Sequence, residues 1–209
     1  MSLSETRRRT LGRRIRLLVA ATISYNVVEA MIAVAEGIRV SSSALVGFGL
    51  DSVVEVSSAA AVAWQFSAKD PESREKPALR FIAWSFFALA AYVTVDAVLS
   101  LIGIGEPRPS AIGIGLAAVS LIVMPLLSFA QRSAGRELGS RSAVADSKQT
   151  LLCTFLSAAL LLGLVANAVA GWWWADPVAA LLIAAVAVRE GREAWRGDPC
   201  CTAHVEELQ

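Results

Sequence analysis

The stretch Ser41–Val62, SSSALVGFGLDSVVEVSSAAAV, decides how the rest of the chain is interpreted. It is apolar and rich in small residues, but the carboxylates of Asp51 and Glu55 lie in its interior. Residues four apart on a helix lie on one face, one turn from each other. An acid at the centre of a membrane span costs roughly 2.5–3.5 kcal/mol on insertion scales, and no basic residue up to Ser67 neutralises this pair. Two carboxylates aimed at one point are half of a divalent-cation site, and we expect that role rather than contact with water or a basic partner.

The composition of the whole chain indicates a multi-pass membrane protein. Of 209 residues, 56% are hydrophobic, and long apolar runs recur from one end of the chain to the other. Three Cys and one His exclude a disulfide framework. The apolar segments contain no nucleophile–base pair and no phosphate-binding loop, so we expect no enzymatic activity, no resident cofactor and no nucleic-acid partner. The basic N-terminus leads into a full-length span followed by further spans, which argues against a cleaved signal peptide.

Six apolar segments are separated by short polar connections. We expect membrane-spanning helices over about residues 15–38, 43–67, 81–104, 111–130, 144–170 and 178–188, the last beginning near Trp174 if the turn before it is tight. Charged or Pro-containing connections occupy residues 68–80, 105–110 and 131–141. The resulting membrane domain covers residues 15–195, between a basic arm, 1–14, and a short tail, 196–209.

Basic residues fall almost entirely on one side of this arrangement. Of the 19 Lys and Arg residues, all but Arg39 and Arg108 lie in the arm, the tail, the second and fourth connections or the helix ends next to them. Because cytoplasmic segments of membrane proteins carry an excess of Lys and Arg, this asymmetry predicts an all-α, six-helix protein of the cell membrane with both termini cytoplasmic.

Three motifs along the chain belong together. Asp51 and Glu55 follow a Ser-rich turn; residues 145–157 read ADSKQTLLCTFLS; residues 171–185 read GWWWADPVAALLIAA. These resemble, in order, the acid-x-x-x-acid pair, the Asp and His-x-x-x-Asp opening of the fifth span, and the Trp–Asp-Pro start of the last helix in the transmembrane domain of the cation diffusion facilitator family. That family exports zinc and related divalent metals. The resemblance covers about residues 15–195 and implies the same fold.

The resemblance implies metal ligands on the second and fifth spans, at Asp51, Glu55, Cys153 and Gln149. Gln149 stands at the family's His and offers only a neutral carbonyl oxygen, so we expect it to orient a carboxylate or a water. Cys153 stands at the family's second Asp and is either a soft ligand for zinc or cadmium or a small hydrophobic side chain. Counting from the helix ends places Glu55 nearer the outer surface than Cys153.

Other polar residues lie within the expected spans. Asn26 and Glu29 in the first span are either site residues or packing groups, and Glu29 facing Asp51 would favour Mn²⁺ or Mg²⁺. Asp96 is expected to contact a neighbouring helix, because the third span lies outside the site bundle of the family.

Three further features have simpler interpretations. Asp146 and Thr150 are also four residues apart and compete with Gln149 and Cys153 as the polar pair of the fifth span. Asp146 can equally begin the fifth helix. Asp176 before Pro177 is expected to begin the sixth helix. Two interpretations, capture of a soft metal or a disordered tail, remain for Cys200, Cys201 and His204.

The motifs together predict an exporter of a divalent cation such as Zn, Cd, Mn, Fe or Co. The resemblance implies exchange for protons and a homodimer, and acids buried without metal would tend to take up protons. The family's cytoplasmic metal-binding domain has no counterpart in this sequence, so we expect any dimer to form through the spans. The alternative is a non-transporting sensor or scaffold with a degenerate site, suggested by Gln149 and Cys153.

Overall fold

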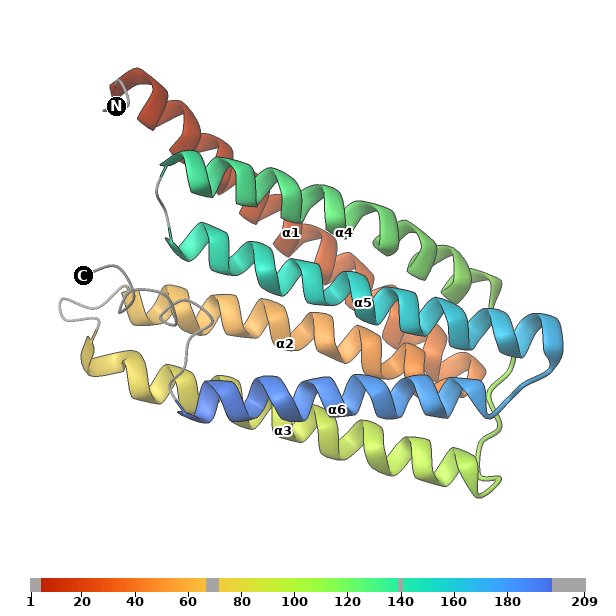
Figure 1. Cartoon of the computed structure of the whole chain (residues 1–209). Coiled ribbons are helices and arrows are strands. Elements are labelled where there is room, and N and C mark those ends of the chain that lie inside the picture. Colours follow the sequence, from red (N-terminus) through yellow and green to blue (C-terminus); the bar gives the residue numbers. More distant parts are fainter. Residues whose placement is uncertain (1–4, 67–71, 139–140, 197–209) are drawn as a thin grey trace, which may run out of the picture.

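Six long helices form an elongated bundle in the described part of the chain, for which a computed structural model was obtained (Figure 1). The structure describes residues 5–66, 72–138 and 141–196, except for some side chains near helix ends, including those of residues 141–149. The helices are α1 Glu5–Val40, α2 Ser43–Phe66, α3 Glu72–Leu101, α4 Ala111–Leu138, α5 Arg141–Ala170 and α6 Ala175–Arg196. α1 begins and α6 ends at the same end of the bundle. The all-helical fold with six helices is thereby confirmed.

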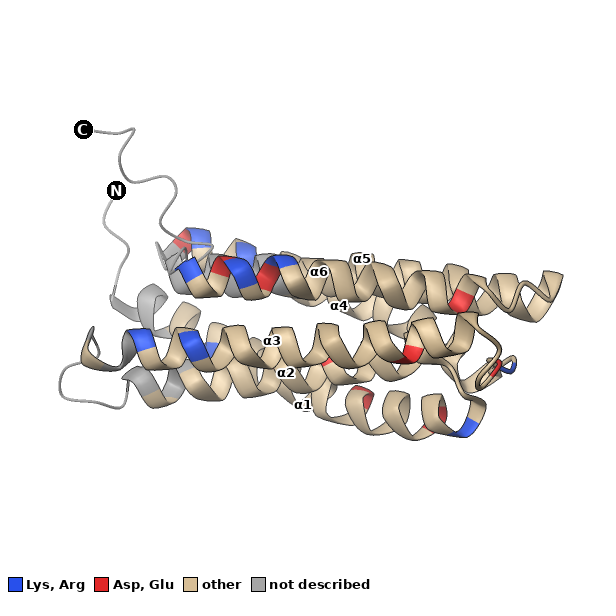
Figure 2. Ribbon diagram, turned by 90° about the horizontal axis from the view of Figure 1, so that it is seen from below, with Lys and Arg blue, Asp and Glu red and all other residues tan. Residues whose placement is uncertain are grey.

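The helices have the length and composition of membrane spans. In the described part of the chain, five of them, α1 to α5, are long and apolar enough to cross a membrane. α6 has 22 residues and carries charged residues throughout its second half, from Arg189 to Arg196, so its apolar part is shorter. Figure 2 shows Lys and Arg gathered where α1 begins and α6 ends, hereafter the basic end, with a few at the opposite end. The chain is a multi-pass membrane protein, as predicted.

Four helices extend further than the hydropathy pattern predicts: α1 begins at Glu5, α6 continues to Arg196, and α3 and α4 enter the expected connections. α3 begins at Glu72 and α4 continues to Leu138, so most of the connections expected at 68–80 and 131–141 is helical. Hydropathy marks only the apolar part of a span, whereas Glu, Lys and Arg are good helix formers and continue the helix beyond it. Pro77 lies in the second turn of α3, where it removes one backbone hydrogen bond.

The site-bearing helix α2 crosses α1 at very short range. A Cβ atom at Gly49 would lie 2.8 Å from Val34 Cγ2 and 2.9 Å from both Ala33 Cβ and the backbone nitrogen of Val34. Only a residue without a side chain fits there, and small residues are what allow helices to approach closely in a membrane. Gly49 lies half a turn before Asp51, so this crossing fixes the position of the acidic face of α2 relative to α1.

We expect Gly49→Ala to destabilise the bundle by about 1–3 kcal/mol, because the added methyl group overpacks the crossing. Gly115→Ala on α4 is the matched control, since a Cβ there meets nothing within 4 Å. The measurement is thermal unfolding in one detergent. Equal unfolding temperatures for the two variants would show that the α1–α2 crossing tolerates extra volume.

Asp176 has a larger structural role than beginning α6. It is fully buried; its Oδ1 accepts a hydrogen bond of 2.5 Å from Ser42 Oγ, and its Oδ2 accepts one of 3.2 Å from the backbone N–H of Ala44. Ser42 Oγ in turn accepts from the backbone N–H of Leu45 at 3.1 Å. A carboxylate at a helix N-terminus satisfies free N–H groups and interacts favourably with the helix dipole. The Asp-Pro motif therefore fixes the start of α6 onto the start of α2.

Candidate metal site

The acidic pair lies near the middle of α2, as predicted. Asp51 is 7% exposed and Glu55 is half-buried, one turn further along the helix. Among the described residues, no group donates a hydrogen bond to the Asp51 carboxylate. A buried carboxylate without a donor is costly, and buried charges in proteins are normally paired or coordinated to metals. Either a bound cation or a proton would relieve this cost.

Glu55 joins three helices. Its Oε1 accepts a hydrogen bond of 2.8 Å from Cys153 Sγ on α5, and its Oε2 accepts one of 2.6 Å from Asn26 Nδ2 on α1. The expectation that Glu55 lies nearer the outer surface than Cys153 is wrong. Figure 1 shows α5 running on past the start of α2, so residues at different distances from their helix ends come to the same depth.

The contact between Glu55 and Cys153 is close to the geometry of a shared metal ion. A zinc ion bound to both at about 2.0 Å from oxygen and 2.3 Å from sulfur, with a tetrahedral angle, holds the two atoms about 3.5 Å apart. The 2.8 Å separation is shorter by about 0.7 Å. A metal ion shared by the two atoms therefore requires them to separate by about this amount. Ser157 Oγ donates a hydrogen bond of 2.7 Å to the backbone C=O of Cys153, not to the thiol, so it does not compete with Glu55.

Asn26 contributes an unused acceptor beside this contact. The residue is 3% exposed, its Nδ2 donates to Glu55, and its Oδ1 is buried without a hydrogen-bond partner among the described residues. Buried polar atoms are nearly always satisfied, and an unsatisfied one calls for an explanation such as an unrecorded ion or water. An amide oxygen next to a carboxylate and a thiol is a suitable ligand for a divalent cation.

Glu29 takes part in a separate cluster one turn away from Asn26 on α1. Its Oε2 accepts a hydrogen bond of 2.9 Å from Ser52 Oγ, and its Oε1 accepts one from Ser120 Oγ, which is itself 2.7 Å from Tyr25 OH. These bonds link α1 to α2 and α4 and occupy both carboxylate oxygens. Sequence reasoning did not identify Tyr25 or Ser120, because nothing in an apolar α4 marks one serine as a partner of Glu29.

Comparison with known families identifies the arrangement. The family model for the cation efflux transmembrane domain matches residues 19–196, which spans all six helices. The chain belongs to this family. No individual curated protein sequence matches the chain. The resemblance to the transmembrane domain of cation diffusion facilitators is therefore confirmed, and the protein is a cation efflux transporter.

In this cation efflux protein, polar groups continue from the Glu55–Cys153 contact toward the basic end. Ser58, one turn beyond Glu55 on α2, has a buried hydroxyl with no hydrogen-bond partner in the described part of the chain. Gln131 was expected in a loop but is fully buried on α4; its Nε2 donates to Thr22 Oγ1 at 3.2 Å, and its Oε1 accepts from Thr150 Oγ1 at 3.4 Å. Extending the helical pattern of α4 past its apolar part was the signal that would have placed Gln131.

The remaining predicted site residues of the cation efflux protein stay predictions. The side chains of Gln149 and Asp146 lie outside the described residues, as do Cys200, Cys201 and His204. Within the described part, no three His, Cys, Asp or Glu side chains gather closely enough to hold a metal ion. Glu55 and Cys153 are in contact, whereas Asp51 lies one turn away from that contact, so a complete ligand set requires a change of side-chain conformation.

Proposed function

We propose that the protein exports a divalent metal ion bound by Asp51, Glu55 and Cys153 between α2 and α5. The observation that carries the proposal is the 2.8 Å contact between Cys153 Sγ and Glu55 Oε1, which joins the two helices at the depth of the acidic pair. The unpartnered amide oxygen of Asn26 is the natural fourth ligand. Four protein ligands match the coordination number that zinc prefers.

The chemistry of these groups favours a borderline or soft cation. Thiolate sulfur selects zinc and cadmium over magnesium and manganese, whereas the two carboxylates supply the negative charge that the ion requires. Metal binding displaces the proton from Cys153, because the thiolate is the ligand form. We assign Gln149 the role of orienting a carboxylate or a water.

We further propose that the exported ion is exchanged for protons. Carboxylates buried in a membrane protein without their cation are strongly destabilised, and uptake of a proton removes that cost. The route from the basic end, which we take to be cytoplasmic by the positive-inside rule, passes the buried hydroxyl and amide groups of Ser58, Thr150 and Gln131.

The test is metal flux into proteoliposomes that contain a metal-sensitive dye and a pH-sensitive dye. Zn²⁺, Cd²⁺, Mn²⁺, Fe²⁺ and Co²⁺ are supplied outside, one at a time. We expect Zn²⁺ and Cd²⁺ to enter fastest and the luminal pH to rise as protons leave. No flux of any of the five metals by a folded protein would contradict the proposal and favour a sensor or scaffold.

A further inference from the structure

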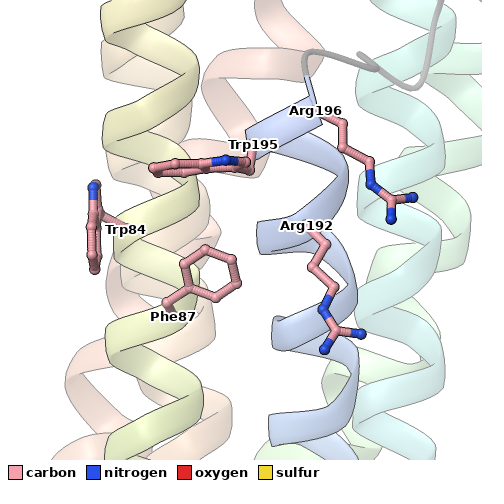
Figure 3. A pocket seen from close by; sticks show the side chains of 5 residues that line it. All are labelled: Trp84, Phe87, Arg192, Trp195 and Arg196. Atoms are coloured by element: carbon pink, nitrogen blue, oxygen red, sulfur yellow. The ribbon is translucent and has the colours of Figure 1, made fainter.

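A cavity lies away from the metal site, between α3 and α6 near the basic end. Its volume is about 310 Å³, and its lining residues come from both helices (Figure 3). They are Trp84, Phe87, Arg192, Trp195 and Arg196. None of these residues takes part in the hydrogen bonds around Glu55 or Glu29, so the transport site does not account for the cavity.

The aromatic wall of the cavity is held in place by its neighbours. Trp84 makes edge-to-face contacts with Phe87 and Trp195, at ring-centroid distances of 6.3 and 6.0 Å. The guanidinium of Arg80 lies over the Trp195 ring, 5.6 Å from its centroid. A Cβ at Gly191 would lie 2.8 Å from Phe87 Cε1, so the Phe87 ring packs directly on the backbone of α6. These contacts hold the rings of Trp84 and Trp195 in place, and both rings still expose apolar surface.

The charged side of the cavity has no carboxylate partner among residues 5–66, 72–138 and 141–196, which the structure describes. Figure 3 shows Arg192 and Arg196 extending from α6 one turn apart, on the side of this helix away from Trp84 and Phe87. Among the described residues, neither makes an ion pair or hydrogen bond, whereas Arg189 on the same helix pairs with Glu193 at 2.8 Å. Two adjacent guanidinium groups match the oxygens of a phosphate, which they can bind through paired N–H groups.

We propose that this cavity binds an acidic phospholipid, with the headgroup phosphate at Arg192 and Arg196 and the upper acyl chain against the aromatic wall. The basic end of a membrane-spanning bundle lies at headgroup depth, where Trp side chains and Arg side chains concentrate. A headgroup with net negative charge suits the site better than a zwitterionic one, because Arg80 adds a third positive charge beside Trp195.

The experiment measures lipid binding by native mass spectrometry of the intact protein titrated with phosphatidylglycerol or phosphatidylcholine. The variant Arg192→Gln/Arg196→Gln is compared with Arg13→Gln/Arg14→Gln, which removes the same charge from exposed positions of α1 near the same end. Trp195→Ala tests the apolar wall. Inorganic phosphate at millimolar concentration serves as the competitor without acyl chains.

We expect the α6 double variant to bind phosphatidylglycerol at least about tenfold more weakly, and the α1 double variant to change by less than about twofold. Trp195→Ala weakens binding as well, phosphatidylcholine binds weakly to all variants, and phosphate does not displace the lipid. Equal weakening in both double variants would reduce the effect to general surface charge and overturn the proposal. Unchanged binding in the α6 variant, or displacement by phosphate alone, would overturn it too.

Discussion

Replacing Asp51 by Asn together with Glu55 by Gln is expected to reduce metal flux by more than about 100-fold. Loss of groups that only support metal ligands typically costs 10–100-fold in affinity or activity, so removing two charged ligands exceeds that range. The amide replacements keep the shape of each side chain but remove both negative charges. A divalent ion then enters the bundle with little to compensate the loss of its hydration shell.

The same double variant is expected to fold at least as stably as the natural protein, and this separates function from structure. Asp51 receives no hydrogen bond from the described residues, so an amide loses nothing there and avoids a buried charge. Gln at position 55 still accepts the hydrogen bond that Asn26 donates to Glu55 at 2.6 Å. Flux and thermal unfolding are measured on one preparation. Asp96→Asn, which neutralises an acid on α3 away from the site, is the control and is expected to transport normally.

Two outcomes would contradict this account. Undiminished flux in the Asp51/Glu55 variant places the cation elsewhere in the bundle. A fall in unfolding temperature that matches the loss of flux makes the pair a structural element rather than a binding site.

The sequence alone predicted the fold well, because the signals that determine a membrane fold are local. The lengths of the apolar segments predict six helices, and the spacing of Asp51 and Glu55 places both acids on one face of α2. The charge asymmetry is also visible in space, since Lys and Arg gather at one end of the bundle (Figure 2). Helix ends were less accurate, because charged residues extend α3 and α4 without changing the apolar pattern.

The contacts of the site depend on how helices cross, and no local signal encodes that. Asn26 was recognised as a polar residue within a span, but its bond to Glu55 follows from the close α1–α2 approach at Gly49. The depth of Cys153 was misjudged because α5 extends past the start of α2. Asp176 illustrates the same limit: Asp-Pro predicts a helix start, whereas its hydrogen bond to Ser42 arises only when α6 packs on α2.

The chemistry of Cys153 leads to the second large effect, a change of metal preference in Cys153→Ser. Serine keeps the size of the side chain and a hydroxyl that can still donate to Glu55, but it replaces a soft sulfur by a hard oxygen. We expect Cd²⁺ and Zn²⁺ flux to fall by about tenfold or more, and Mn²⁺ flux to change by less than about threefold. We expect the protein to retain its fold, because the serine hydroxyl can donate the same hydrogen bond to Glu55.

Binding can be observed directly through the ultraviolet absorption that arises when cadmium binds a thiolate. Cys200 and Cys201 are also thiols, so the comparison is made in a Cys200→Ser/Cys201→Ser background, where Cys153 is the remaining cysteine of the chain. In that background Cd²⁺ should produce the band, and the further Cys153→Ser or Cys153→Ala change should abolish it. Normal Cd²⁺ and Zn²⁺ flux in both Cys153 variants, without a band in the background protein, would identify Cys153 as a small packing residue. The carboxylates of α2 would then have to hold the ion with oxygen ligands alone, and the preferred cation would shift toward manganese.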